Sequence, residues 1–428
     1  MIKKIRWKLI VTISVCLLFL LLGQLFFQPT LQRFNHNVNK YTTMNMNKNE
    51  GVHHFVLFVI QKLNSLYPDL RTIYQGQITP YHDELPQPLA NIIEPVVRVN
   101  SLRQLQQVLE NLGDTKTIVF EPGIYTFSGR SIKLQHEGTE PVIMRVAEPE
   151  NTQFIQMNQV AFAIKSANWV LSGFQFKGEC AQDKDCEHAI HIVGDADNVS
   201  IISNDFTNYN AAIKSNGYSA KNTDLRQFPD NVSIKHNRFV NQHPRNTKKS
   251  VTPIDVVGGD NWQISHNFIA DFVKQGGNRI TYGAFLKGGG RYGKIHDNVV
   301  ACKWKLPYGS VFDARVGLSL GGGGTGVKYC QSERCVYEHD KGIIKDNLVL
   351  NCTNEVALYI NKSTNSLVTG NRLISTLGID AKYTASLADY SNNQLHGNLR
   401  LDGSSEVQQR CANQQLWWFD DGVSVRHD

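Results

Sequence analysis

The segment NVSIKHNRF, from Asn231 to Phe239, decides the fold because its nine-residue pattern recurs along the chain. Related segments begin, in chain order, at Asn168, Asn198, Asn261, Tyr292, Lys341, Asn365 and Asn392. Successive starts are 24 to 49 residues apart. Repeats of this length are typical of stacked supersecondary units, each of which contacts only its neighbours.

The pattern inside each repeat favours short strands. Its fourth and ninth positions are mostly apolar, and asparagine occupies the seventh position between them in every repeat except the one that begins at Asn168, which has Phe174 there. Asparagine tolerates the left-handed backbone of a bend, whereas a helical repeat needs apolar residues three and four apart. The sequence therefore predicts an all-β protein, a single-stranded right-handed parallel β-helix of the pectate-lyase-like kind. We expect a structural ladder of stacked asparagines, formed by Asn204, Asn237, Asn267, Asn298, Asn347, Asn371 and Asn398.

The stretch from Ser101 to Gly113 predicts a helix. Ser101 is a favourable N-cap, and Gly113 is suited to end the helix. Between them, Leu102, Leu105, Val108, Leu109 and Leu112 fall on one face. Because the open end of a β-helix exposes its core, we expect this helix to cap the N-terminal end.

The N-terminus predicts a membrane segment. Four basic residues precede Leu9 to Phe27, nineteen residues without a charge, which is long enough to cross a bilayer. No small-residue cleavage site follows, so an uncleaved anchor is favoured over a signal peptide. The basic flank should stay inside. We therefore expect a membrane-anchored protein whose β-helix is exported to the periplasm or the extracellular space.

The expected organisation has four parts. Residues 1–28 form the anchor or signal sequence, 29–95 a spacer in which 55–66 has the composition of a short helix, 96–413 the β-helix, and 414–428 a C-terminal cap or tail. Trp417 and Trp418 in the tail suit either a cap or the stacking of a sugar ring.

The net charge is +6, of which the four basic residues at the N-terminus supply +4. The rest of the chain is only mildly basic. This balance is compatible with an acidic ligand and excludes a typical nucleic-acid-binding surface, which is strongly and locally basic.

Seven cysteines lie outside the N-terminal apolar run. We expect Cys180 to pair with Cys186 and Cys330 with Cys335, because an oxidising compartment favours such pairs. Cys330, Cys335 and His339 fall short of a closed zinc shell, so no metal site is predicted.

A second strand precedes each later repeat, and its outward-facing residue predicts a polar column on one face. The members are His191, Lys214, Asp255, Phe285, Ser319 and Tyr359, with Lys287 two residues beyond Phe285. Neighbouring coils lie about 4.8 Å apart, so these side chains should lie side by side.

The longest interval, from Tyr292 to Lys341, predicts a loop on the binding side. It contains the glycine run from Gly321 to Gly324, which permits close backbone approach. The run is not a phosphate-binding loop, because no Lys-Ser/Thr follows it.

Three segments near the N-terminus carry a family resemblance. They are TIVFEPGIYTFSG (117–129), SIKLQHEGTEPVIMRVAEPEN (131–151) and AIKSANWVLSGFQFKG (163–178). This order resembles the opening coils of polysaccharide lyases of the chondroitinase B and alginate lyase type, over roughly residues 97–300. The resemblance implies the β-helix fold and cleavage of an acidic, uronate-containing polysaccharide by β-elimination.

The resemblance also implies site residues. The family's catalytic lysine is matched by Lys214 in AAIKSNG, and Lys287 in GAFLKGGG stands one residue before the family's arginine position. Arg291 is the candidate for the missing guanidinium. The resemblance implies calcium as a possible cofactor. Only Asp255 matches the acidic cluster that binds calcium in that family, so the cofactor stays unknown.

We therefore predict catalytic roles for Lys214, Lys287 and Arg291, and substrate-binding roles for His191, Asp255, Arg315 and Tyr359. The predicted partners are a polysaccharide and, through the N-terminal helix, the membrane. Two alternatives remain open on the same scaffold: a uronate epimerase, and a carbohydrate-binding or assembly protein without catalysis.

Overall fold

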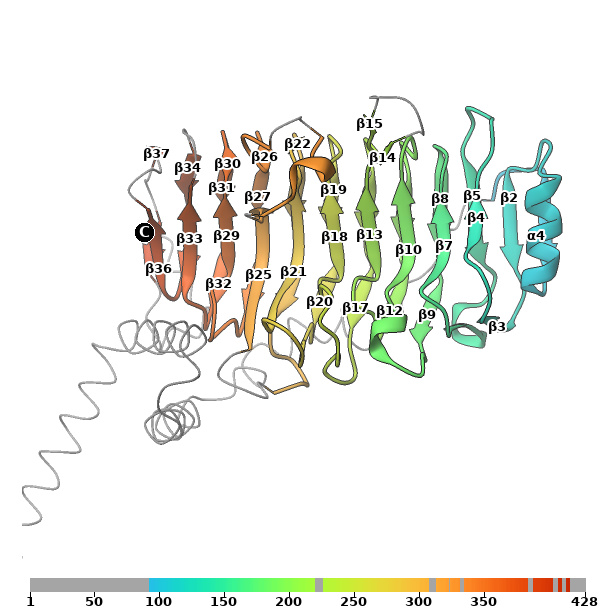
Figure 1. Ribbon diagram of the computed structural model, residues 1–428, viewed down its shortest axis with the longest axis horizontal. Coiled ribbons are helices and arrows are strands. Elements are labelled where there is room, and N and C mark those ends of the chain that lie inside the picture. The colour runs from blue at the N-terminus through green and yellow to red at the C-terminus, as the bar shows by residue number, and fades with distance from the viewer. Residues whose placement is uncertain are drawn as a thin grey trace, which may run out of the picture.

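The computed structural model describes residues 92–219, 226–307, 313–322, 324–331, 335–383, 388–402, 407–409 and 413–415. Over these residues the chain winds through three long parallel sheets of 12, 10 and 11 strands, which run side by side along the stack (Figure 1). The predicted parallel β-helix is confirmed. No helix in this part of the chain is long and apolar enough to cross a membrane. The predicted anchor, most of the spacer, and Trp417 and Trp418 lie outside the described residues.

The first sheet, sheet A, contains the first strand of every repeat. Its members are β1 (Val96–Val99), β2 (Thr117–Phe120), β5 (Val142–Val146), β8 (Trp169–Ser172), β11 (Ser200–Ile202), β16 (Ser233–Lys235), β19 (Gln263–Ser265), β23 (Lys294–His296), β27 (Ile343–Lys345), β31 (Leu367–Thr369), β34 (Ala388–Ser391) and β37 (Val407–Gln409).

Sheet B follows the asparagine turn. Its members are β3 (Gly123–Phe127), β6 (Thr152–Gln156), β9 (Gln175–Gly178), β12 (Asp205–Thr207), β17 (Arg238–Val240), β20 (Phe268–Ala270), β24 (Val299–Ala301), β28 (Leu348–Leu350), β32 (Arg372–Ile374), β35 (Gln394–Leu395) and β38 (Gln414–Gln415).

Sheet C contains the third strand of most coils. Its members are β4 (Ile132–Leu134), β7 (Val160–Ile164), β10 (His188–Val193), β13 (Ile213–Asn216), β18 (Ile254–Val257), β21 (Ile280–Lys287), β25 (Ala314–Gly321), β29 (Leu358–Asn361), β33 (Gly378–Lys382) and β36 (Asn398–Leu401). Short strands β22 (Gly290–Arg291), β26 (His339–Asp340) and β30 (Ser363–Thr364) form a separate parallel ladder, and β14 (Tyr218–Ser219) pairs antiparallel with β15 (Arg226–Gln227).

The repeat positions explain the core. In sheet A, Ile201, Ile234, Ile264 and Ile295 are consecutive partners and all are fully buried. In sheet B, the rings of Phe206 and Phe239 stack 4.8 Å apart. Full burial of one such side chain stabilises the fold by about 1.5–3 kcal/mol, so a regular repeat supplies a continuous core.

The asparagine ladder is present, with one correction. Each Asn side-chain amide from Asn204 to Asn371 donates to the next asparagine carbonyl at 2.9–3.1 Å. After Asn371 the ladder continues to Asn393 and then Asn413, not to Asn398. Tyr390 pairs with Val368, so the last repeat is set five residues earlier than its sequence pattern indicates. Asn398 instead begins β36.

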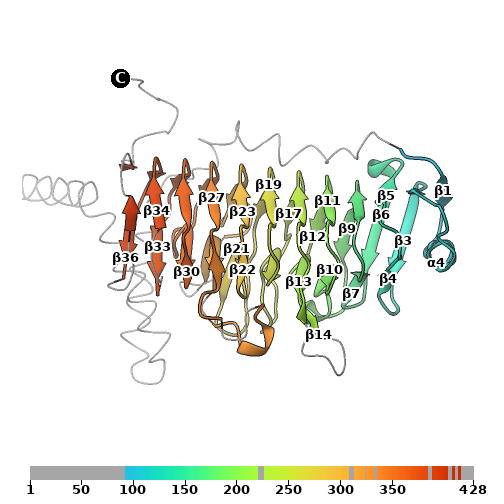
Figure 2. The same ribbon diagram turned by 90° about the horizontal axis from the view of Figure 1, so that it is seen from above.

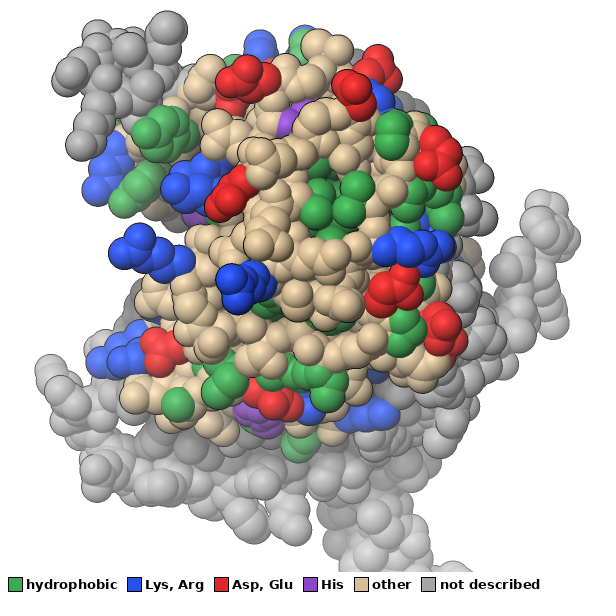
Figure 3. All heavy atoms as spheres, turned by 90° about the vertical axis from the view of Figure 1, so that its right-hand side faces the viewer, with side chains coloured by type: hydrophobic (Ala, Val, Ile, Leu, Met, Phe, Trp, Pro, Cys, Tyr) green, Lys and Arg blue, Asp and Glu red, His purple; other side chains and the backbone are tan. Residues whose placement is uncertain are grey.

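Helix α4 (Leu102–Glu110) lies at one end of the stack (Figure 1). The hydroxyl of Ser101 accepts a hydrogen bond from the Gln104 backbone N–H, as expected of an N-cap, and Leu105 is fully buried in the core. The helix ends slightly earlier than predicted, with Asn111 as its C-cap. Acidic and basic side chains are interspersed over this end (Figure 3), and a mixed-sign surface does not concentrate a charged ligand.

In the part of the chain that the structure describes, three disulfides join Cys180 to Cys186, Cys330 to Cys335, and Cys302 to Cys352. The first two confirm the predicted pairs. The third was not predicted, because its cysteines lie 50 residues apart in different coils. Cys411 lies outside the described residues.

Candidate functional site

The predicted column exists on sheet C. The backbone partners run from His191 to Lys214, Asp255, Phe285, Ser319 and Tyr359, one residue per coil. The apolar residues on either side of each column position fixed this register, since they face the core. The strand alternation thus places charged and aromatic side chains next to one another.

Lys214 and Asp255 form a buried ion pair. The Lys214 Nζ lies 2.5 Å from Asp255 Oδ1, and their side chains are 19% and 6% exposed. Burial raises the pKa of Asp255, but the charges of Lys214 and Lys287 lower it by more, so the net shift is downward. The carboxylate therefore stays ionised and holds the Lys214 ammonium in place.

Lys287 lies on the next coil, with its Nζ 4.2 Å above the ring of Phe285. Burial lowers the pKa of Lys287; Asp255 opposes this shift and Lys214 adds to it. Its Nζ has no hydrogen-bond acceptor among the described side chains and backbone groups. Gly322 packs closely on the aliphatic part of this side chain, since a Cβ on Gly322 would lie 2.9 Å from Lys287 Cδ. The site therefore contains a half-buried amine that loses its proton more readily than an ordinary lysine.

His191 lies at the other side of Lys214. Its Nε2 lies 2.8 Å from Asn216 Oδ1, and its ring centroid is 5.4 Å from that of His188. Burial lowers the pKa of His191, and burial together with the nearby His191 lowers the pKa of His188 to about 4. Both imidazoles are therefore neutral near pH 7 and suited to hydrogen bonding.

Two projections flank this part of sheet C. The β14–β15 hairpin follows the Lys214 strand, and the segment with the short helix η3 (Val327–Tyr329) follows β25. Both project on the side of the stack where sheet C lies (Figure 2). The strands of Asp255 and Lys287 lie between them in the sheet order.

Glu338 anchors the second projection, a role that was not predicted from the sequence. Its carboxylate accepts hydrogen bonds from the backbone N–H groups of Gly288, Gly324 and Thr325 at 2.9–3.2 Å, and from the Thr325 hydroxyl at 2.7 Å. Burial raises the pKa of Glu338, but these hydrogen bonds lower it by more. The glycine-rich segment is thereby held against the coil that carries Lys287.

The column continues beyond Tyr359 to Asp380 and Arg400. Asp380 accepts from Lys382 Nζ at 2.7 Å and from Arg400 at 3.1 Å, and Lys382 lies 5.5 Å from the Tyr359 ring centroid. This extension was not predicted from the sequence. The alternation in β33, with Ile379 and Ala381 buried, was the signal that would have found it.

Two predicted arginines lie apart from this cluster. Arg291, in β22, directs its guanidinium to the carboxylate of Asp260 through bonds of 3.0 and 2.7 Å. Arg315 is 1% exposed, and its guanidinium donates to the backbone carbonyls of Cys302, Leu306 and Pro307 at 2.7–3.1 Å. The segment that precedes β25 covers Arg315, so its predicted contact with substrate is corrected to a role in fixing that segment.

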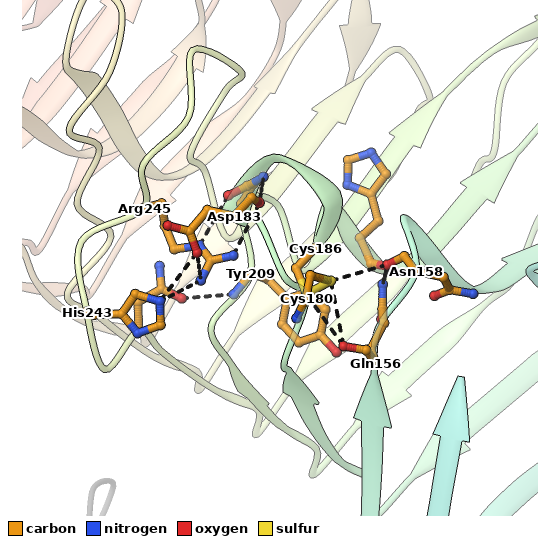
Figure 4. Close-up of a disulfide and its surroundings, with 11 residues drawn as sticks. Gln156, Asn158, Cys180, Asp183, Cys186, Tyr209, His243 and Arg245 are labelled. Atoms are coloured by element: carbon orange, nitrogen blue, oxygen red, sulfur yellow. Dashed lines mark hydrogen bonds and ion pairs between the residues drawn. A yellow bond between two sulfur atoms is a disulfide. The ribbon is translucent and has the colours of Figure 1, made fainter. Parts of the chain in front are cut away.

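A second polar feature, a cavity of about 370 Å³, lies beside the Cys180–Cys186 disulfide. Figure 4 shows this disulfide with Asp183, His243 and Arg245 near it. Asp183, between the two cysteines, bonds Arg245 at 2.8 Å and His243 at 3.3 Å. Arg245 is 2% exposed and also donates to Asn210. Because Asp183 already compensates the buried guanidinium, this cavity is a weaker candidate for binding an anion than the sheet C cluster.

No model of a protein family matches the chain, and no curated protein matches it. Among solved structures, the fold is similar to the catalytic unit of a thermostable α-1,3-glucanase from Streptomyces thermodiastaticus, with 12% identity, a TM-score of 0.45, and coverage of 79% of this chain and 72% of that chain. The fold is also similar to that of the surface adhesin PfbA of Streptococcus pneumoniae, with 11% identity, a TM-score of 0.47, and coverage of 74% of this chain and 94% of that chain. An alginate lyase from a Paenibacillus species has 11% identity and a TM-score of 0.32, with coverage of 75% of this chain and 95% of that chain. With TM-scores below 0.5, these likenesses carry no functional argument.

Proposed function

We propose that the chain binds an acidic polysaccharide along sheet C and cleaves it by β-elimination, with Lys287 as the base. The observation that carries this proposal is the half-buried Lys287 amine, which lies over Phe285 with a lowered pKa, beside a carboxylate that Lys214 already neutralises.

The charge of the cluster favours an anionic ligand. Asp255 is one carboxylate between two lysines, and His191 is neutral because burial lowers its pKa. Glu338 is a second carboxylate whose charge acts on Lys287, but its oxygens already accept hydrogen bonds from three backbone N–H groups and one hydroxyl. Lys214 and Lys287 therefore keep N–H donors for a uronate carboxylate, and a partly desolvated site strengthens the attraction.

The chemistry assigns different tasks to the two lysines. Lys214 donates one N–H to Asp255 and keeps two further donors for the uronate carboxylate, whose neutralisation acidifies the C5 proton. The neutral amine of Lys287 takes that proton. The C5–H electrons form the C4=C5 double bond, the C4–O bond breaks, and the departing oxygen takes a proton from water.

Tyr359 extends the surface for neighbouring sugars. It is half-buried on the same column, and apolar ring faces of sugars pack on such aromatic side chains. Because the column runs across the strands, the polymer would lie along the axis of the stack, at about 4.8 Å per coil.

We also propose that the β-helix is exported and that the N-terminal apolar run anchors it. Three disulfides among the described residues support an oxidising compartment. Protease treatment of intact cells tests this. Digestion of the β-helix in intact cells, or after the outer membrane alone is opened, supports it, and protection until the inner membrane is lysed contradicts it.

The test of function is an assay of the purified full-length chain on a panel of uronate polymers. Elimination produces a conjugated unsaturated uronate, so ultraviolet absorbance should rise on at least one polymer. Epimerisation seen by proton NMR without cleavage would replace the lyase by a uronate epimerase. Binding without either reaction would leave a carbohydrate-binding protein.

A further inference from the structure

A group of metal-binding side chains lies at the turn between sheets A and B, outside the site described above. His266 follows β19, while His296 ends β23 on the next coil and Asp297 follows it. His266 and Asp297 occupy the same turn position in consecutive repeats, with φ of 55° and 54°. Ser265 and His296 are backbone partners, so the register brings the three side chains together.

The geometry is close to that of a binding site. One donor atom from each of His266, His296 and Asp297 lies within 4.8 Å of the other two. The two imidazole centroids are 6.0 Å apart, and the rings are nearly perpendicular at 84°. His296 Nδ1 lies 2.6 Å from Asp297 Oδ2, so this nitrogen and this carboxylate already face one another, and a bound ion would replace the hydrogen bond between them.

We propose that His266, His296 and Asp297 bind one divalent transition-metal ion, of the class of Zn²⁺. Two imidazoles and one carboxylate are donors that Zn²⁺ prefers, whereas Ca²⁺ and Mg²⁺ favour sets made of oxygen alone. Three protein ligands leave the fourth tetrahedral position to water.

The adjustment needed is small. Metal–donor bonds of 2.0–2.2 Å place tetrahedral donors about 3.4 Å apart. The His296–Asp297 pair, at 2.6 Å, must therefore open by about 0.8 Å, and donor atoms as far as 4.8 Å apart must approach by up to about 1.4 Å. The exposed side chain of His266 is free to make most of this movement. Lys345, which is next to His296 in sheet A, lies 3.6 Å from the carboxylate of Asp346, so its charge is partly compensated.

The ion would link neighbouring coils on an edge that the polysaccharide does not occupy. Its binding is therefore independent of the proposed lyase activity, and it is measured without substrate.

Titration of the full-length chain with zinc chloride, followed by isothermal calorimetry, tests the site. We expect one ion per chain and a rise in the unfolding temperature, with no competition from excess Ca²⁺ or Mg²⁺. His266→Asn keeps a residue that accepts positive φ and should lose binding, as should His296→Gln. Asp297→Asn replaces an anionic ligand by a neutral amide and should weaken binding by at least as much as the loss of an outer-shell partner does, roughly 10–100-fold.

His243→Asn is the control, because His243 is an exposed histidine that contacts Asp183 instead. It should bind zinc like the unmodified chain. Circular dichroism without zinc should be the same for every variant, which separates loss of the site from loss of the fold. Absence of binding up to ~1 mM zinc, or equal binding by His266→Asn and His296→Gln, would overturn the proposal.

Discussion

The ammonium of Lys214 lies 2.5 Å from the buried carboxylate of Asp255, and Lys287 acts on the same carboxylate from the next coil. One acid between two lysines is the electrostatic centre of sheet C. It holds one lysine as a fixed cation and leaves the other, on Phe285, with a lowered pKa.

Replacement of Asp255 should affect both stability and pH dependence. Asp255→Asn leaves Lys214 without its partner in a largely buried position, so the free energy of unfolding should fall by about 3 kcal/mol. Because Asp255 raises the pKa of Lys287, its loss should lower that pKa further and shift the rising limb of the activity profile to lower pH. Denaturant unfolding and initial rates across pH measure the two effects.

Asp195→Asn is the matched control, since Asp195 is an exposed carboxyl on the turn after β10. Its unfolding free energy should stay within about 0.5 kcal/mol of the unmodified chain, with an unchanged pH profile. Equal effects of the two substitutions would contradict the ion-pair account.

Lys287 should give folding its own pH dependence. Burial lowers its pKa in the folded state, so between that pKa and the unfolded value of about 10.4 the unfolded chain binds more protons. The free energy of unfolding should therefore rise with pH in this window. Lys287→Met removes the group, and the difference between the two stability curves should vary with pH in that sense. A constant difference would show that Lys287 titrates normally.

The repeat pattern in the sequence and the structure assign different asparagines to the ladder position after Asn371, Asn398 and Asn393 respectively. Asn393 makes hydrogen bonds to Asn413, Val368 and Ser391 and accepts from Asn371, whereas Asn398 begins β36. At about 1 kcal/mol per hydrogen bond, the loss of these four bonds in Asn393→Ala should cost about 4 kcal/mol. Asn398→Ala should cost less than about 1 kcal/mol. Thermal unfolding compares them, and the reverse order would restore the sequence-based register.

Much of this architecture could be predicted because the repeat fixes it physically. Residues that alternate along a strand face the core and the solvent in turn. The position of Ile234 in the repeat therefore predicted that it is buried beside Ile201, and the matching positions of His191, Lys214 and Asp255 predicted that they are neighbours on sheet C. The last repeat was misplaced because Tyr390 occupies the position of an aliphatic residue.

Loops were not predictable in the same way, because no periodicity governs them. Arg315 lies on sheet C by register, yet the segment from Cys302 to Pro307 folds over it, and backbone carbonyls of that segment accept hydrogen bonds from its guanidinium. Arg291 has Asp260 as its partner for a similar reason, since the turn before β19 brings that carboxylate beside it. Glu338 acts through backbone donors that no sequence pattern marks.

The Cys302–Cys352 and Cys180–Cys186 disulfides should contribute unequally to stability. The Cys302–Cys352 bond spans 50 residues and the Cys180–Cys186 bond only 6. Loop-closure entropy then predicts a stabilisation of about 4 kcal/mol for the first and about 2 kcal/mol for the second. Paired Cys→Ala variants of each bond, unfolded in guanidinium chloride, measure this difference. A larger loss on removal of the short bond would contradict the entropic explanation.

The central claim, that Lys287 is the base of an elimination reaction on sheet C, is tested most directly by the initial rate of unsaturated uronate formation. The polymer that supports cleavage is given to the unmodified chain, Lys287→Ala, and Lys294→Ala, an exposed lysine on sheet A. Loss of a general base costs about 10²–10⁴-fold in rate. We expect such a loss for Lys287→Ala with polymer binding retained, and the full rate for Lys294→Ala. Full activity of Lys287→Ala would contradict the account.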